Sequence, residues 1–440
     1  MATLALALAG GLMTVFFLAG LYVAVALGLI AFSLMFFLSD RPLWEIVSQI
    51  TWNVNTNVVL VAIPLFVLMG ELLLRSGLTE VLYTTLSKWL NPLPGGLMHS
   101  NIAACAVFAA VSGSSVATAA TISSVALPTF RTKKYNERLV IGSLAAGGTL
   151  GILIPPSINM IVYGLLADES IGRLYIGGVF PGLLMALSFM AVIFVAAKVW
   201  PSIAPREEGA PWRERFVSLV SMLPIAVLIF LVLGTIYLGI ATPTEAASFG
   251  VAGAFLLALL KRRVNLAMLK EALLSTVTTT SMIMLILSAA FIINFVLAHL
   301  GAPATLARAV GAAGFNQLQM VLVLIGFYLL LGTFMDGFSM MVITIPIIAP
   351  ILKAMGVNLV WFGILVVMLT EAALISPPEG LNLYVLHGVR KRALGQERKG
   401  TMMDVWVGVL PFLLAIVVTM ALVIAFPEIV LWLPTTMKGR

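Results

Sequence analysis

Long apolar runs, separated by short polar segments, follow one another along almost all of the 440 residues. About 18 or more largely apolar residues are enough to cross a bilayer as an α-helix. The alternation of apolar and polar positions that is typical of an outer-membrane β-barrel does not occur in the sequence. The pattern therefore predicts an all-α polytopic membrane protein whose candidate spans are Thr3–Leu18, Leu21–Leu38, Val54–Leu74, Leu139–Leu166, Tyr175–Val199, Phe216–Leu238, Pro243–Leu260, Thr276–His299, Val357–His387 and Val405–Leu433.

Two further apolar regions are interrupted at their centres by polar, turn-prone tips. Residues 97–130 contain the tip Ser112–Ser115, and residues 318–352 contain the tip Gly332–Gly337. Each leg has about 15 residues, or roughly 22 Å of helix, which is shorter than the roughly 30 Å of the hydrocarbon core. We therefore expect two re-entrant helical hairpins whose tips reach the middle of the membrane.

A proline pair interrupts each of two other apolar runs. Pro155–Pro156 lies within residues 139–166, and Pro377–Pro378 lies within residues 357–388. A proline has no backbone N–H, and its ring clashes with the carbonyl one turn earlier, so each pair breaks a helix. Broken backbone at membrane depth is tolerated only where it is buried in protein or lines a cavity. The sequence thus predicts two broken helices beside a functional cavity.

The proline pairs belong to a longer internal repeat, in which further matches have the same sequence separation as the two pairs. At this offset Gly28 matches Gly250, Pro128 matches Pro350, and Ser114 falls on Asp336, so the repeats would be residues 1–205 and 206–440. Scaffold and transport domains would each be drawn from both repeats. Chance similarity between apolar segments is the alternative, and it is disfavoured because the matches fall on proline and glycine at one offset.

Charge predicts the orientation of these segments. Only 10% of the residues are charged, against about 25% in soluble domains. Five loops hold 19 of the 25 Lys and Arg residues, and the positive-inside rule makes these loops cytoplasmic. The net charge of +7 then reflects loops beside a lipid bilayer, so no nucleic-acid partner is expected. The first hairpin would enter from the cytoplasm and the second from outside, which is the inverted topology of secondary transporters. The five loops are residues 75–99, 131–138, 198–215, 261–270 and 390–399.

The two tips and the two breaks carry oxygen atoms suited to a small hard cation. Serine hydroxyls and the carbonyls released by a break can ligate sodium without a fixed charge. Asn159 and Asn382 follow the breaks, where they can hydrogen-bond a substrate or hold the opened backbone. The alternative for the serines is close helix packing. The candidate atoms belong to Ser112, Ser114, Ser115, Gly151, Ile154 and Pro155 in the first repeat and to Gly332, Asp336, Ala373, Ser376 and Glu379 in the second.

Ionisable residues at membrane depth indicate function by default, which singles out Asp336, Glu371 and Glu379. For Glu379 the alternative is a buried partner of a backbone amide or an arginine. Glu71 and Glu245 lie near span ends and are expected to be structural, and the single cysteine, Cys105, is expected to pack in the core. Phosphate-loop and zinc-protease motifs are missing from the sequence, so we expect neither an enzyme nor a cofactor.

Five segments, in this order and spread over nearly the whole chain, resemble the large membrane subunit (M) of the tripartite ATP-independent periplasmic (TRAP) transporters of the ion transporter superfamily. They are Ser112-Gly-Ser-Ser-Val-Ala-Thr-Ala-Ala, Gly151-Ile-Leu-Ile-Pro-Pro-Ser-Ile, Glu169-Ser-Ile-Gly-Arg-Leu-Tyr-Ile-Gly-Gly, Gly239-Ile-Ala-Thr-Pro-Thr-Glu-Ala-Ala and Pro377-Pro-Glu-Gly-Leu-Asn-Leu. The resemblance implies an elevator-type importer of small organic acids (carboxylates), driven by a sodium gradient, in the inner membrane of a bacterium or archaeon. It also implies two partners, a small membrane subunit (Q) and a periplasmic substrate-binding protein (P).

The resemblance also implies where the ions bind. One sodium site would comprise Ser112, Ser115, Gly151, Ile154 and Pro155, and the other Gly332, Ala373, Ser376 and Glu379. We expect the substrate between the tips and the breaks, near Ser114, Asn159, Asp336 and Asn382. The chain departs from the family at four of these positions: Gly and Thr are usual at Ala373 and Ser376, an apolar residue at Glu379, and Pro at Asn159. Glu379 would strengthen cation binding or couple a proton instead.

Three alternatives remain open at the level of sequence. A related symporter, coupled to sodium or protons, would transport substrate without a binding protein. A channel would conduct without accumulating substrate against a gradient. A membrane enzyme is the least favoured, since the sequence shows no pairing of a nucleophile with a base.

Overall fold

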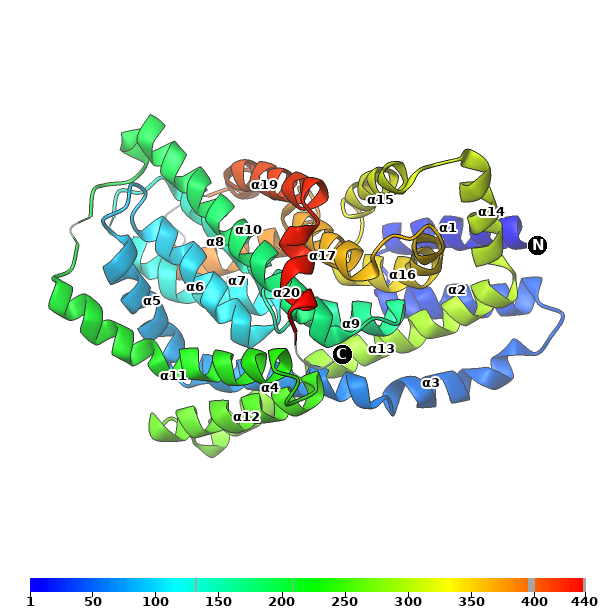
Figure 1. Cartoon of the computed structure of the whole chain (residues 1–440), viewed down its shortest axis with the longest axis horizontal. Coiled ribbons are helices and arrows are strands. Elements are labelled where there is room, and N and C mark those ends of the chain that lie inside the picture. The colour runs from blue at the N-terminus through cyan, green and yellow to red at the C-terminus, as the bar shows by residue number, and fades with distance from the viewer. Residues whose placement is uncertain (131–132, 208, 395–399, 438–440) are drawn as a thin grey trace.

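The computed structural model describes residues 1–130, 133–207, 209–394 and 400–437, which form helices and connecting turns without a β-strand (Figure 1). The basic loops predicted at residues 131–138 and 390–399 therefore lie partly outside the described residues. In chain order the elements are α1 (Ala2–Leu18), α2 (Val23–Leu38), η1 (Leu43–Ile46), α3 (Val47–Asn55), η2 (Val58–Val61), α4 (Ala62–Arg75), α5 (Leu78–Leu90), α6 (Leu97–Ser112), α7 (Ser115–Phe130), α8 (Glu137–Leu153), α9 (Ile158–Ala167), α10 (Ile171–Val199), η3 (Pro201–Ile203), α11 (Trp212–Tyr237), α12 (Pro243–Leu260), α13 (Leu266–His299), α14 (Ala302–Ala313), α15 (Gln317–Leu331), α16 (Gly337–Ala354), α17 (Leu359–Ile375), α18 (Leu381–Leu394), α19 (Met402–Ala425) and α20 (Glu428–Thr435).

The all-α membrane architecture is confirmed, although not every predicted span is a single helix long enough to cross a bilayer. Among the described residues, seven helices are long and apolar enough to cross a bilayer, and the bent pair α8 and α9 makes an eighth candidate. Helices α1 and α2 have only 17 and 16 residues. The last predicted span divides at Pro427 into α19 and α20. Conversely α16, predicted as a hairpin leg, is itself long enough to span.

Two helical hairpins occur where the polar tips predict them. Helices α6 and α7 meet at Gly113, whose φ of +62° is left-handed and is available to glycine without strain. Helices α15 and α16 are joined by residues 332–336. Asp336 closes this second tip as the N-cap of α16, because its carboxylate accepts the backbone N–H of Ser339 at 3.0 Å. Whether the hairpins re-enter the membrane from opposite sides stays a prediction.

Both proline pairs interrupt a helix, as predicted. The first pair separates α8 from α9, and the two helices are bent by 42°. The second pair separates α17 from α18. Both Pro–Pro peptide bonds are cis. Ser157 restarts the first helix as the N-cap of α9, accepting the backbone N–H of Met160 at 3.4 Å.

The succession of helices recurs at the offset of the sequence repeat. Helices α8 and α17 begin at residues 137 and 359 and end at residues 153 and 375. Helices α7 and α16 begin at residues 115 and 337. In each half a hairpin is thus followed directly by a broken helix.

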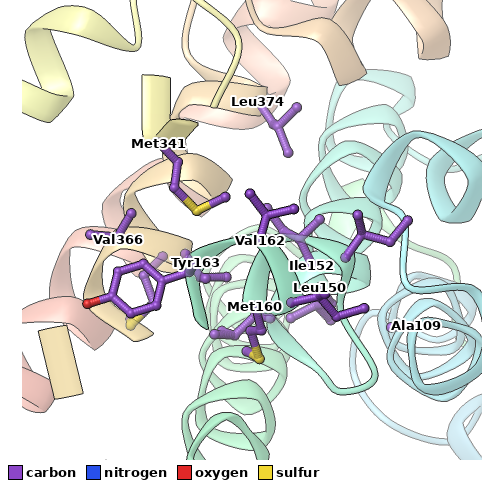
Figure 2. Packing of buried hydrophobic residues seen from close by; sticks show 14 of the residues in the cluster. Ala109, Leu150, Ile152, Met160, Val162, Tyr163, Met341, Val366 and Leu374 are labelled. Carbon is purple, nitrogen blue, oxygen red and sulfur yellow. The ribbon is translucent and has the colours of Figure 1, made fainter. Parts of the chain in front are cut away.

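Helix α8 is buried along nearly all of its length. It packs against α6, α7, α17 and α19, and small residues allow the close approach. A Cβ on Gly142 would lie 1.9 Å from the Gly408 carbonyl oxygen of α19. Figure 2 shows the apolar packing around the first break. In Figure 1, α4, α11 and α12 lie along the lower edge at the left and centre, and α13 lies above α3 on the right.

The predicted cytoplasmic loops are connected to one another by ion pairs. Among the described residues, the ion pairs between distant segments join these loops or residues beside them: Arg75 with Glu271, Lys88 with Glu214, Lys133 with Glu207, Arg138 with Asp404, and Arg390 with Glu137 and Asp404. The basic loops therefore gather at one end of the helices, as the charge pattern requires. The positive-inside rule assigns this end to the cytoplasm.

Candidate functional site

Both hairpin tips and both broken helices meet at one cavity of about 440 Å³, which we call the central cavity. One wall comes from the tips and breaks, and the opposite wall comes from α4 and α13. The first wall comprises Gly113–Ala117 with Ala120, Ile152, Ile158, Asn159, Asp336–Phe338, Thr370, Leu374 and Leu381, and the second comprises Glu71, Ser275, Thr279, Met282, Ile283 and Ile286. The predicted convergence of elements from the two halves of the chain is therefore present.

The first tip packs directly on the first break. The Gly113 carbonyl accepts the backbone N–H of Ile158 at 3.4 Å. A Cβ on Gly151 would lie 2.5 Å from the Ser114 carbonyl oxygen, so only glycine fits there without displacement. Thr118 donates its hydroxyl to the same carbonyl at 2.7 Å, and its oxygen lies 2.7 Å from the Ser112 hydroxyl. The structure thus places the first tip, which contributes Ser112 to the predicted first sodium site, in contact with the first break at Gly151.

The prolines explain why carbonyls are available at this point. Pro155 and Pro156 cannot donate the i+4 hydrogen bonds that Gly151 and Ile152 would receive in a continuous helix. The Ser157 hydroxyl replaces one of these donors, reaching the Ile152 carbonyl at 2.6 Å. The Gly151 carbonyl is deprived of its helical donor in the same way. A sodium ion prefers such oxygen ligands, so the donor set fits the predicted ion.

The second tip packs on the second broken helix in a similar way. A Cβ on Gly332 would lie 2.8 Å from the Cβ of Ala373, and a Cβ on Gly337 would lie 2.5 Å from that of Thr370. The Ser376 N–H donates to the Ala373 carbonyl at 3.4 Å. Gly332 and Ala373, predicted to share a sodium site, are therefore in contact.

The two asparagines that follow the breaks connect the halves of the chain. Asn382 donates from Nδ2 to the Ser115 hydroxyl at 2.7 Å and to the Ala145 carbonyl at 3.4 Å. Asn159 donates from Nδ2 to the Thr370 hydroxyl at 3.4 Å. Of the predicted substrate residues, Ser114, Asn159 and Asp336 line the central cavity, whereas Asn382 is buried beside it.

Four helices begin at the central cavity, and the first residue of each lines it: Ser115 of α7, Ile158 of α9, Gly337 of α16 and Leu381 of α18. A helix N-terminus carries a partial positive charge of roughly half a unit and presents free N–H groups. Asp336 offsets part of this charge at α16 by capping it. The arrangement favours a ligand with an anionic group near the tips.

The wall formed by α4 and α13 contains polar residues that sequence reasoning missed. Glu71 lines the cavity, accepts the Ser275 hydroxyl at 2.6 Å, and pairs with Arg75 at 3.2 Å. The ion pair and the hydrogen bond agree with the structural role predicted for Glu71, but its position in the cavity wall was not predicted. Thr279 lies one turn further along α13. In the sequence, the cluster of Ser and Thr residues at 275–281 could have indicated that this part of the apolar run faces a polar cavity.

The other ionisable candidates differ in their surroundings. Glu371 is fully buried in α17, beside the Thr149 hydroxyl, and neither carboxylate oxygen has a hydrogen-bond partner of standard geometry among the described residues. Glu379 is exposed at the second break and is not the buried partner considered as its alternative. Glu245 belongs to the capping box of α12, and Cys105 is buried in the core. The structural predictions for these last two residues are confirmed.

Comparison with known proteins identifies the family. Residues 11–429 match the family described as "Tripartite ATP-independent periplasmic transporter, DctM component". The chain is 31% identical to the C4-dicarboxylate TRAP transporter large permease protein DctM of Rhodobacter capsulatus, over 96% of this chain and 97% of that protein. It is 30% identical to the sialic acid TRAP transporter large permease protein SiaM of Vibrio cholerae, over 87% and 88% of the two chains.

Solved structures share the fold at lower sequence identity. The crystal structure of the YdaH transporter of Alcanivorax borkumensis superimposes with a TM-score of 0.61 at 16% identity, covering 94% of this chain and 97% of that one. A likeness at this identity concerns the fold alone. The family match and the relatives, together with the apolar helices, show that this chain belongs to the TRAP transporter large permeases and is a multi-pass protein of the bacterial inner membrane.

Proposed function

We propose that this chain is the transport subunit of a sodium-coupled importer of small organic acids. The observation that carries the proposal is the convergence of two hairpin tips and two broken helices on one cavity of about 440 Å³. Discontinuous helices that meet near the midplane provide ion and substrate sites in secondary transporters. The permease relatives named for C4-dicarboxylates and sialic acid support an organic acid as the substrate.

The substrate binds in the central cavity with its acid group toward the hairpin tips. The N-termini of α7, α9 and α18 supply N–H groups and partial positive charge there. Ser114 and Asn159 add a hydroxyl and an amide. The apolar side chains of Met282, Ile283 and Ile286 cover the rest of the molecule.

Sodium binds on either side of this cavity. The first site comprises Ser112, Ser115, Gly151, Ile154 and Pro155, and its support is the packing of the first tip on the first break. The second comprises Gly332, Ala373, Ser376 and Glu379, and its support is the contact between Gly332 and Ala373. Because ions and substrate share the same two tips, ion binding organises the cavity for substrate.

Transport follows an elevator mechanism in which the hairpins and broken helices move together against a scaffold. The helix succession that recurs at the offset of the proline pairs supports repeats of residues 1–205 and 206–440 with inverted topology. Each hairpin tip packs directly on the broken helix of its own repeat, which supports movement of the hairpins and broken helices as one rigid body. The scaffold then includes α4 and α13, which form the opposite wall of the cavity. As in the family, a small membrane subunit and a periplasmic binding protein are its partners.

Uptake into proteoliposomes tests this proposal. The complete transporter should accumulate a radiolabelled C4-dicarboxylate or sialic acid only with an inward sodium gradient and with the binding protein present. The variant Ser115→Ala should weaken sodium dependence, whereas Ser124→Ala, on the same helix but bonded to the Thr121 carbonyl, should not. Uptake without the binding protein would favour the independent symporter, and uptake indifferent to sodium would refute the ion assignments.

A further inference from the structure

A second cavity, of about 530 Å³, lies along the same helices as the central cavity, and we call it the outer cavity. Helices α9, α13 and α16 line both cavities. On α13 the central cavity ends at Ile286 and the outer cavity begins at Phe291, which at 1.5 Å per residue separates them by about 7.5 Å. Buried apolar side chains occupy the intervening stretches of α9 and α16, including Val162, Tyr163 and Met341 (Figure 2).

Three asparagine side chains line the outer cavity: Asn53, Asn57 and Asn294. The side-chain oxygen of Asn57 accepts the backbone N–H of Val59 at 2.9 Å. The side-chain oxygen of Asn53 accepts from Gln49 Nε2 at 2.8 Å. These two oxygens are therefore engaged, and the NH₂ groups are the parts of the two amides left to face a ligand.

Asn294 is the most informative of the three. Neither its Oδ1 nor its Nδ2 has a hydrogen-bond partner among the described residues, although both atoms are shielded from solvent. Buried polar groups are nearly always hydrogen-bonded in native proteins, because an unmade bond is unfavourable. Asn294 lines the outer cavity, but its two amide atoms are turned away from the open space. A rotation of this side chain brings the amide into the cavity, where a ligand supplies the missing bond.

The chemistry of this site favours a carboxylate. Each amide NH₂ offers two donors, and a carboxylate accepts up to about four hydrogen bonds. The remaining wall is mostly apolar, with Leu165, Phe291 and Phe295 among its residues. Neutral donors bind an anion less tightly than a guanidinium does. Weaker binding suits a site from which the ligand must dissociate again.

The position of the site relates it to the transport path. Helix α13 runs from the basic loop at residues 261–270 to His299, and the outer cavity lies near the His299 end. The positive-inside rule places that end outside the cytoplasm. We propose that the outer cavity is an entry subsite, where the amides of Asn53, Asn57 and Asn294 bind the carboxylate of the organic acid before it reaches the central cavity. This inference rests on the proposed import function.

Thiol labelling tests the subsite without requiring transport. The single native cysteine, Cys105, is buried, so a reporter Ala298→Cys on the rim of the outer cavity reacts alone with impermeant reagents. Right-side-out vesicles containing the transporter would be treated with sulfonatoethyl methanethiosulfonate, an anion, or trimethylammonioethyl methanethiosulfonate, a cation. Both reagents react with the same thiol, so its intrinsic reactivity cancels in the ratio of the two labelling rates. The ratio therefore reports the preference of the site for an anion over a cation.

The neutral change Asn294→Leu should lower the anion-to-cation ratio at Ala298→Cys about fivefold, the effect of one lost hydrogen bond. Acetate should slow labelling of Ala298→Cys before this change and not after it. The control reporter is Ala304→Cys in the neighbouring cavity of about 480 Å³, which has no amide side chain among its described lining residues. There Asn294→Leu should leave the ratio unchanged.

An unchanged ratio at Ala298→Cys would overturn the proposal, as would labelling only from the cytoplasmic side. Reaction with a permeant apolar maleimide alone would also overturn it and assign the cavity to lipid chains. If Asn294→Leu does not fold, Asn53→Ala, at an exposed position, provides the same test. Uptake by the unsubstituted transporter is measured in parallel. If uptake occurs but Asn294→Leu does not change the labelling ratio, only the subsite is refuted. If the labelling ratio changes but no uptake occurs, only the transport function is refuted.

Discussion

The contact between the first hairpin tip and the first break makes Gly151→Ala a sharp test of the ion site. A Cβ at residue 151 would lie 2.5 Å from the Ser114 carbonyl oxygen and 2.8 Å from the Thr118 hydroxyl. An ordinary contact begins at 3.4 Å, so the tip must withdraw by about 0.9 Å, a displacement of the size that over-packing forces on tight interiors. The carbonyl that would have to move belongs to the tip itself.

Over-packing of this kind costs about 1–3 kcal/mol. If the ion-bound state alone requires the closed contact, the whole penalty falls on sodium binding. At about 1.4 kcal/mol per factor of ten, the sodium concentration for half-maximal uptake should rise roughly 5- to 150-fold. Substrate affinity measured at saturating sodium should change much less.

The assay is sodium-dependent uptake by the reconstituted transporter, together with sodium-dependent thermal unfolding of the purified protein. Gly326→Ala is the matched control, because this glycine lies inside α15 and a Cβ there meets nothing within 4 Å. The Gly326→Ala control should transport normally. Its unfolding temperature should be no lower than that of the unsubstituted protein, because alanine in a helix is more favourable than glycine by about 0.5–1 kcal/mol. A Gly151→Ala protein with sodium dependence within twofold of the unsubstituted protein would refute the reasoning.

Three further substitutions test the packing around the site by thermal unfolding in detergent. Gly142→Ala places a Cβ 1.9 Å from the Gly408 carbonyl oxygen, so it should destabilise the protein by about 3 kcal/mol; unchanged unfolding would mean that α8 and α19 are not in close contact. Asn382→Leu removes the 2.7 Å bond to Ser115 and should destabilise by about 1–3 kcal/mol while lowering uptake; normal uptake would argue against a role for this bond. Ser157→Ala removes the N-cap of α9 and the 2.6 Å bond to the first break, so a loss of about 1–2 kcal/mol is expected, and an unchanged unfolding temperature would contradict it.

Several elements of the site were predictable because their causes are local. The proline pairs at residues 155–156 and 377–378 break their helices, since proline cannot donate the helical hydrogen bond whatever surrounds it. The tips at Gly113 and Asp336 depend on a left-handed glycine and an N-cap carboxylate, which are also local effects. The constant offset between matching prolines and glycines then related the two sets of elements from the amino-acid order alone.

Helix lengths were less predictable, because apolar composition does not show where a helix ends. The span predicted to start at Val54 begins instead at Val58, after the separate polar helix α3. The run predicted as the final span contains Pro427, where the chain ends one helix and starts another. In both places the sequence carries a local stop, Asn55–Asn57 in the first and Pro427–Glu428 in the second, which the long apolar stretches beside it outweighed in the prediction.

The sequence by itself determined the membrane class, the two helical hairpins and the two breaks, because periodicity, proline and glycine act on the nearest residues. Only the tertiary structure decided that Glu71 and Ser275 form the opposite wall of the central cavity, that Asn382 bonds Ser115 in the other half of the chain, and that three asparagines share the outer cavity. These relations depend on how whole helices pack. A side chain's partner across a helix interface is set by the position and rotation of both helices, which no local pattern specifies.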